Sequence, residues 1–463
     1  MDRTEKLRNE KIGKLLFSFS LPGMIGMGVM ASYSLIDRYF IGNVVGTLGI
    51  SAIHISMPII MVFFAFGMLL GFGASSAVSL KLGEGKKKEA ELILGNVFSL
   101  SLILSTIVTG ILYIFLDPLL ISFGAQGTVL EYARTFLKIS LVGGVFQSIA
   151  WSLNNVIRAE GNPKTAMITM IISALINIVL NPLFIVIFKL GMAGSALATV
   201  IAQLVSLIWI FAYFLQKRSH LHFHYSNFKL KYEIVAQIMK IGFPFFVMHI
   251  AGAITISVAN KALTMYGGDT AIAVLGIISP IAMFIMMPIF GINQGMQPII
   301  GFNYGAKQFD RVKSTLRLSI FAAVSIGIIG LLVVDIFGRE MISKFCDNDH
   351  ALIEMGTHAI RIYLIMLPVI GFQVVSSVYF QAVGKPTQTL ILTLTRQIIF
   401  VLPLMLILPQ FFHTDGIWYS APIADFCSSV LTGILLYIEV KQLDKKHNAQ
   451  QDISTTLAMN TDF

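Results

Sequence analysis

The chain has 463 residues, of which 56% are hydrophobic and 12% are charged, and its formal net charge is +9 at pH 7. Soluble domains carry about 25% charged residues, so this composition excludes an ordinary soluble protein and indicates an integral membrane protein. The two cysteines argue against a disulfide framework, and we expect no cleavable signal peptide after the charged N-terminus.

Twelve segments of the chain are long and apolar enough to span a bilayer, which takes about 20 residues of helix. Their long unbroken apolar runs favour helices over the short alternating strands of a membrane β-barrel. The predicted helices cover residues 15–41, 49–78, 91–116, 132–157, 165–188, 192–215, 234–262, 271–300, 314–337, 353–382, 387–408 and 416–440.

The basic residues of the predicted loops are unevenly divided between the two sides of the membrane. Most of them fall in loops on the same side as the N-terminus, and few fall in loops on the other side. The positive-inside rule then places both termini in the cytoplasm. Because the basic residues are spread over several short loops rather than gathered on one face, we expect no nucleic-acid partner.

The sequence repeats itself about halfway along the chain. At an offset of 222 residues Pro22 falls on Pro244 and Gly73 on Gly295, and "RAEGNPKT" matches "QAVGKPTQ" and "GMAGSAL" matches "GIWYSAP" at similar offsets. An even number of spans in each half makes these parallel repeats about an axis along the membrane normal. The expected parts are an N-lobe at 12–215, a cytoplasmic linker at 216–233, a C-lobe at 234–440 and a cytoplasmic tail at 441–463.

Two pseudo-symmetric six-helix bundles are typical of transporters that work by alternating access. The chain contains no P-loop, no dinucleotide fingerprint after a strand, and neither an H-E-x-x-H nor a G-x-S-x-G motif. We therefore expect no enzyme activity, no catalytic residues, no metal site and no cofactor, and transport would draw on an ion gradient.

Several motifs together resemble the multidrug and toxic compound extrusion (MATE) family, and the DinF/MepA-like bacterial branch in particular. They are "IDRYFIGN", "IRAEGNPK", "INIVLNPLFI", "GMAGSALAT" and "GMQPIIGFNYGA", and the resemblance covers roughly residues 12–440. It implies twelve helices in two lobes and an antiporter that expels amphiphilic, cationic compounds in exchange for H⁺ or Na⁺. It also implies a multi-pass protein of the bacterial cytoplasmic membrane, and we expect a monomer among membrane lipids.

Asp37 is the first candidate for a functional residue, because an aspartate inside a membrane helix costs about 2.5–3.5 kcal/mol on insertion scales. The alternative is that Asp37 is shallow enough to be hydrated or pairs with Arg38, although adjacent helical residues point about 100° apart. Asn177 and Asn181 share one helix face and offer oxygen ligands for a hard cation. Their alternative role is to hydrogen-bond neighbouring helices together.

The resemblance implies an ion site in the first lobe, formed by an aspartate of helix 1, an Asn and often an Asp of helix 5, and a Thr of helix 6. The matching residues are Asp37, Asn177, Asn181 and Thr199. The chain departs from this pattern because Asn181 replaces a carboxylate, which leaves one formal negative charge. The coupling ion is expected to be one H⁺ or one Na⁺ per cycle, with H⁺ favoured.

The second lobe lacks the acidic pattern of the NorM branch of the family. Arg396 and Asp425 are expected to form a buried ion pair if their helices adjoin, as a structural or gating lock or, alternatively, with a direct role in proton transfer. Gln294 and Gln297 are candidates for lining the cleft or for bonding across helices.

Abundant phenylalanine and methionine suggest a drug-binding surface, because these side chains adapt to many flat ligands and attract cations. Met61, Phe64 and Met287 are the drug-contact candidates, against the alternative of lipid-facing and core packing. A lipid-linked oligosaccharide flippase or a dedicated natural-product exporter of the same superfamily is the alternative function. The few basic residues within the spans disfavour the flippase.

Overall fold

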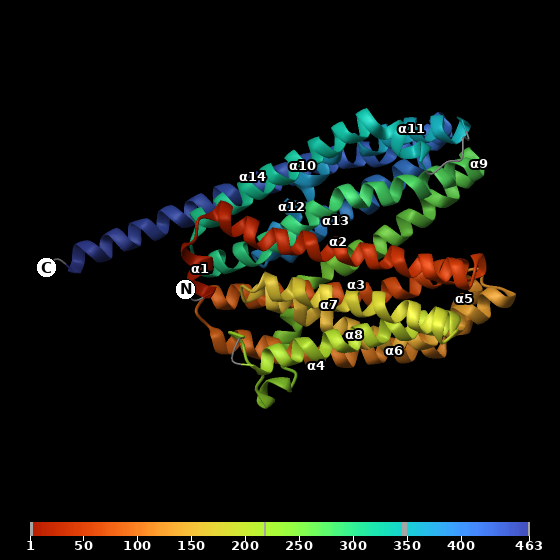
Figure 1. The fold of residues 1–463 in the computed structure, drawn as a ribbon. Coiled ribbons are helices and arrows are strands. Elements are labelled where there is room, and N and C mark those ends of the chain that lie inside the picture. The colour runs from red at the N-terminus through yellow and green to blue at the C-terminus, as the bar shows by residue number, and fades with distance from the viewer. Residues whose placement is uncertain (1–2, 217–218, 345–349, 462–463) are drawn as a thin grey trace. The chain divides into compact units, whose positions relative to one another are not determined.

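The structure is a computed structural model and describes residues 3–216, 219–344 and 350–461. Every regular element in this part of the chain is a helix (Figure 1). The chain divides into two compact units: unit 1 holds Met1–Thr4 and Leu21–Phe246, and unit 2 holds Glu5–Ser20 and Val247–Phe463. Residues 217–218 of the expected linker and 462–463 of the expected tail lie outside the described residues.

The first half of the chain forms eight α-helices and two short irregular helices, the π-helix η1 and the 3₁₀-helix η2. The helices α3, α4, α6, α7 and α8 pack side by side in unit 1 (Figure 1). The bounds of these elements are α1 Arg3–Asn9, α2 Ile12–Val44, α3 Thr47–Gly83, α4 Lys87–Ile114, α5 Leu116–Ser122, α6 Gly127–Ala159, α7 Pro163–Pro182, η1 Leu183–Ile187, α8 Gly191–Leu215 and η2 Tyr225–Phe228.

The second half forms six α-helices and the π-helix η3. Within unit 2, α10 packs against α11 and α12, and α14 packs against α12 and η3. Two of the helices are interrupted once, α9 at Gly268 and α14 at His413. The bounds are α9 Tyr232–Gly305, α10 Phe309–Ser343, α11 His350–Leu364, α12 Leu367–Ala382, α13 Pro386–Leu394, η3 Thr395–Val401 and α14 Leu402–Thr461.

Ten helices of the described chain are long and apolar enough to cross a membrane. Counting the bent pair α11–α12 as one further span gives up to eleven. This pair bends by 42° within the predicted span at 353–382, since Pro368 cannot donate a helical hydrogen bond at the start of α12. The segment Pro386–Ala449 has 64 residues and would be ~96 Å long as one helix, about three times the hydrocarbon thickness. Because its backbone breaks at His413, its two parts correspond to the last two predicted spans.

The backbone repeats the internal symmetry of the sequence. Eight of the eleven described residues with a positive φ angle form four pairs at the repeat offset, and three of these eight residues are not glycine. Such angles are unfavourable for residues with a Cβ atom, so their recurrence reflects the same turn geometry in both halves. The pairs are Gly46 and Gly268, Gly85 and Lys307, Gly161 and Gly384, and Lys189 and His413.

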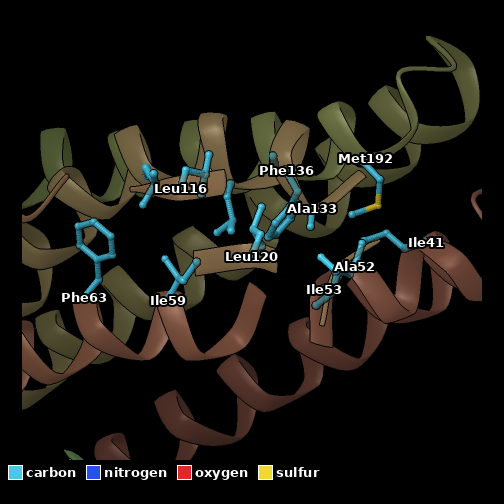
Figure 2. Packing of buried hydrophobic residues seen from close by; sticks show 14 of the residues in the cluster. Ile41, Ala52, Ile53, Ile59, Phe63, Leu116, Leu120, Ala133, Phe136 and Met192 are labelled. Atoms are coloured by element: carbon cyan, nitrogen blue, oxygen red, sulfur yellow. The ribbon is translucent and has the colours of Figure 1, made fainter. Parts of the chain in front are cut away.

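A hydrophobic cluster in unit 1 holds the second half of α2 against α3, α5, α6 and α8 (Figure 2). Ile41 of α2, Leu120 of α5 and Ala133 of α6 are completely buried in it. Fully burying a side chain the size of Ile or Leu contributes about 1.5–3 kcal/mol. The cluster therefore fixes which face of α2 points toward its neighbours, and Asp37 lies one helical turn before Ile41.

The described part of the expected linker is bound to unit 1. Asn96 of α4 donates to the carbonyl oxygen of Asn227 at 3.0 Å and accepts from the backbone N–H of Lys231 at 2.8 Å. The buried carboxylate of Glu160 accepts from the hydroxyl of Ser219 at 2.8 Å and from the phenol of Tyr213. These bonds tie the segment to α4 and to the C-terminal ends of α6 and α8.

Candidate functional site

Asp37 lies seven residues before the end of α2 and is partly buried. Its position is set by Ile41, which is four residues later on the same helical face and is buried in the core cluster. Arg38 is exposed and forms no ion pair with Asp37 in the described structure. The neighbouring arginine therefore does not neutralise the carboxylate by direct contact, and other groups surround Asp37.

The two asparagines of α7 form the second part of the site. Asn177 and Asn181 are one helical turn apart and are 2% and 0% exposed. Pro182 directly after them cannot donate to the carbonyl group of Ile178, and the chain continues as the π-helix η1. Local widening of a helix into π geometry is frequent at functional sites, and here it directly follows Asn181.

The start of α8 supplies two hydroxyl groups. Gly194 lies so close to η1 that an added Cβ atom would be 2.9 Å from the carbonyl carbon of Phe184. This close approach brings Ser195 and Thr199, one turn apart on the same face of α8, to the asparagines and to Asp37. Ser195 was not predicted from the sequence, although its spacing of four residues from Thr199 placed both hydroxyls on one face.

The five side chains form one hydrogen-bonded network. Oδ1 of Asp37 accepts from Nδ2 of Asn181 at 2.9 Å and from Oγ of Ser195 at 2.7 Å. Nδ2 of Asn181 also donates to Oδ1 of Asn177 at 2.9 Å, and Nδ2 of Asn177 donates to Oγ1 of Thr199 at 3.0 Å. The structure thus brings together all four residues predicted for the first lobe and adds Ser195.

One buried oxygen of this network has no partner. Oδ1 of Asn181 is buried, and no donor of the described residues lies within hydrogen-bond distance of it. Leaving a buried polar atom unsatisfied costs about 1–3 kcal/mol, so such an atom in a native structure needs an explanation. A bound water or a cation beside Asp37 would satisfy it, since amide oxygens are ligands for hard cations.

A largely apolar cavity of about 60 Å³ adjoins the network inside unit 1. It is large enough for several water molecules, because one water needs about 10–15 Å³ by this measure. Nε1 of Trp151, Oε1 of Gln203 and Oγ of Ser206 border it and have no hydrogen-bond partner among the described residues. The lining residues are Met30, Tyr33, Gln147, Ala150, Trp151, Asn154, Thr169, Met170, Ser173, Asn177, Thr199, Ala202, Gln203, Ser206 and Ile210.

In the second half Arg396 and Asp425 form an ion pair with Nε 2.5 Å from Oδ1. Asp425 is 1% exposed, and Nε2 of Gln373 donates to its backbone oxygen at 2.9 Å and to the hydroxyl of Ser428. Arg396 lies in the π-helix η3, which changes the direction of the side chain relative to a regular helix.

The remaining predicted residues differ in their surroundings. Met61 is exposed, Phe64 packs its ring 5.2 Å from the ring of the cavity residue Trp151, and Met287 is 7% exposed. Gln294 and Gln297 are buried in α9. The described residues contain no group of three or more His, Cys, Asp or Glu side chains that could hold a metal ion.

Comparison with known proteins gives consistent results over most of the chain. The sequence matches the family described as MatE over residues 22–183 and 241–407. It is 29% identical to the multidrug export protein MepA of Staphylococcus haemolyticus over 92% of this chain and 93% of that protein. The matched segments include Asp37, Asn177 and Asn181.

Solved structures agree with this match. The MATE multidrug transporter DinF-BH is 40% identical, with a TM-score of 0.86 over 92% of this chain and 95% of that chain. A transporter of the MOP superfamily from Pyrococcus furiosus is 25% identical, with a TM-score of 0.90 over 95% of this chain and 98% of that chain. The chain therefore belongs to the MatE family, whose members are transporters and not enzymes.

Proposed function

We propose that this protein is a secondary active multidrug efflux antiporter that exports amphiphilic, cationic compounds in exchange for H⁺ or Na⁺. It works by alternating access between an N-lobe (12–215) and a C-lobe (234–440), joined by the linker at 216–233. It acts as a monomer in a bacterial cytoplasmic membrane, with both termini and the tail at 441–463 in the cytoplasm. The names of the relatives support the export of drugs, since MepA is a multidrug export protein and DinF-BH is a multidrug transporter.

The observation that carries the proposal is the network around Asp37. Its single carboxylate is surrounded by amide and hydroxyl groups, so binding one H⁺ or one Na⁺ neutralises the site. In the deprotonated state Asp37 is held by the donors of Asn181 and Ser195, and in the neutral state these bonds weaken, since charge-assisted bonds are the stronger ones. Occupancy of Asp37 thus changes the contacts that α2 makes with α7 and α8.

The orientation of the two amides supports H⁺ rather than Na⁺ as the ion. Nδ2 of Asn181 donates to the carboxylate and Nδ2 of Asn177 donates to Thr199, so both amides present N–H groups rather than oxygens to these neighbours. A sodium ion would need several oxygen ligands, so both amides would have to turn. A proton on Asp37 needs no such rearrangement of the first lobe.

The cavity next to Asp37 supports the class of drug. Met30, Tyr33, Trp151 and Met170 provide thioether and aromatic surfaces in its lining. Aromatic faces attract organic cations by about 0.5–2 kcal/mol each, and methionine adapts to irregular ligands. A flat cationic compound bound there would bring its positive charge near Asp37 and would therefore compete electrostatically with H⁺ for this carboxylate.

Ethidium efflux from proteoliposomes, with H⁺ and Na⁺ gradients imposed separately, tests the proposal. We expect efflux to follow the H⁺ gradient, to ignore added ATP and to be abolished by Asp37→Asn while the variant remains folded in the membrane. Asp117→Asn is the matched control, because Asp117 pairs with Arg134 outside the network. ATP-dependent efflux with both gradients collapsed, or unchanged efflux by the Asp37 variant, would contradict the proposal.

A further inference from the structure

Arg158, in the last turn of α6, is a buried arginine without an acidic partner. It is 6% exposed, and no carboxylate of the described chain forms an ion pair with it. Nη1 donates to Oδ1 of Asn155 at 3.2 Å, and Nη2 contacts Sδ of Met170 at 3.3 Å. A buried charge is normally paired, because its transfer from water is costly, so this guanidinium needs an explanation.

The position of Arg158 relates it to the cavity. Met170 and Asn154, which is one helical turn before Arg158, both line the cavity. Asn177, at the other end of the cavity, belongs to the Asp37 network and lies seven residues after Met170 on α7, a distance of ~10 Å along the helix. The cavity therefore has the carboxylate network at one end and the guanidinium at the other.

The helices around Arg158 pack without spare room. An added Cβ atom on Gly26 of α2 would be 2.7 Å from Sδ of Met170, and one on Gly71 of α3 would be 2.7 Å from Nδ2 of Asn155. Both partners of the guanidinium are thus held in place by glycines of neighbouring helices. These contacts leave the guanidinium fixed behind Met170, which itself lines the cavity.

We infer that Arg158 is an electrostatic barrier that closes the end of the cavity far from Asp37 to cations. A fixed positive charge in a low-dielectric, narrow route excludes protons and metal cations, as arginines do in selective membrane pores. An ion that reaches Asp37 then cannot leave through this end, so it crosses the membrane only when the protein changes conformation. The inference rests on the proposed coupling at Asp37.

The repeat provides a natural substitution for the test. At the offset of 223 residues that matches "RAEGNPKT" with "QAVGKPTQ", Arg158 corresponds to Gln381, which is also buried. Arg158→Gln therefore removes the charge and keeps a buried polar side chain of the kind that the second half has there. Arg158→Lys keeps the charge and alters the contacts to Asn155 and Met170.

The experiment uses the full chain in liposomes that contain the pH dye pyranine, with an inside-negative potential imposed and no drug present. We expect Arg158→Gln to raise H⁺ influx several-fold over wild type, and Arg158→Lys to remain as tight as wild type. Influx equal to wild type in a folded Arg158→Gln variant would overturn the inference. An equal leak in the Gln and Lys variants would also overturn it, because packing rather than charge would then be responsible.

A second pair of variants decides the matter if Arg158→Gln does not fold. Thr169 lines the cavity beside Met170, so Thr169→Asp places a negative charge near Arg158, and Thr169→Asn is its neutral control. We expect H⁺ to leak through the Thr169→Asp variant and not through the Thr169→Asn variant. If neither variant leaks, the barrier is refuted. If the leak of Arg158→Gln persists with Asp37→Asn, the barrier stands and the proposed coupling at Asp37 fails.

Discussion

At Asp37 the chain keeps a charge in a membrane helix by surrounding it with neutral donors rather than with a cation. Ser195 and Asn181 both donate to the same carboxylate oxygen, and each charge-assisted bond contributes about 1.5–3 kcal/mol. These bonds offset the insertion cost of about 2.5–3.5 kcal/mol for an aspartate. The ionised carboxylate is therefore held without a permanent counter-charge.

Asn181→Asp tests what the missing second carboxylate does. It would place a second acid next to Asp37, where Nδ2 of Asn181 now lies 2.9 Å from Oδ1. Two carboxylates at this distance strongly favour a shared cation or proton. We expect the affinity for ²²Na⁺ to rise at least about tenfold, equivalent to ~1.4 kcal/mol, and Na⁺-driven ethidium efflux to appear.

Asn181→Leu is the control for this prediction, because it removes the amide without adding charge. We expect it to bind no Na⁺ and to impair efflux. Sodium binding by Asn181→Asp that is no stronger than wild type would mean that the oxygens of the network cannot converge on one ion.

The sequence predicted four of the five residues in the network, because Asp37 and the two asparagines are unusual in apolar helices and the family pattern supplied Thr199. It could not single out Ser195, since a helical serine usually donates to its own backbone. Ser56 and Ser152, for example, bond the carbonyl oxygens four residues before them. Only the packing of α8 on η1 turns Ser195 toward the carboxylate.

At the scale of helices and turns, hydropathy predicted where the apolar segments lie but not how they bend. The π-helices η1 and η3 and the bend between α11 and α12 depend on hydrogen-bond register, which an apolar pattern does not carry. The turn positions that need a positive φ are easier to predict than the bends, because most of these positions are glycine. Lys307 and His413 occupy the same conformations without being glycine.

Lys307→Gly is expected to stabilise the protein. Lys307 has a φ of 58°, is exposed, and corresponds to Gly85 of the first half. The left-handed conformation costs a residue with a Cβ atom about 1–2 kcal/mol, and the greater freedom of glycine in the unfolded chain offsets part of the gain. We expect a net increase of ~0.5 kcal/mol in the free energy of unfolding, measured by thermal denaturation in detergent.

Lys240→Gly gives the matched comparison, since Lys240 is exposed in the regular part of α9. Glycine in a helix interior is destabilising by about 1 kcal/mol. The two variants should therefore shift the melting temperature in opposite directions. A decrease in both would mean that the turn at Lys307 is not strained.

Considered as a whole, the molecule has two halves that repeat their backbone but differ in what fills equivalent positions. In the first half Ala150, Ser173 and Gln203 line the cavity. The repeat offsets place Gln373, Arg396 and Ser428 at these positions in the second half, where they join Asp425 by hydrogen bonds. The sequence predicted the pair of Arg396 with Asp425, but not the cavity, because a cavity depends on how side chains of several helices meet.

The Arg396–Asp425 pair is expected to act as a structural lock of the second half. Asp425→Ala would leave the guanidinium of Arg396 without its partner, at a cost of up to about 3–5 kcal/mol, the range for fully buried pairs. The double variant Arg396→Met with Asp425→Ala removes both charges, and replacing a buried pair by apolar groups is often neutral. We therefore expect the double variant to unfold at nearly the wild-type temperature.

A double-mutant cycle on unfolding in detergent, with ethidium efflux measured in parallel, distinguishes a lock from a part of the transport chemistry. The more exposed pair of Lys313 and Asp444 in the same unit is the control, and its loss should cost less than about 1 kcal/mol. If the pair only holds the helices together, the double variant regains both stability and efflux. Regained stability without efflux would show that the two charges take part in transport, and the second half would then contribute an ion-responsive site of its own.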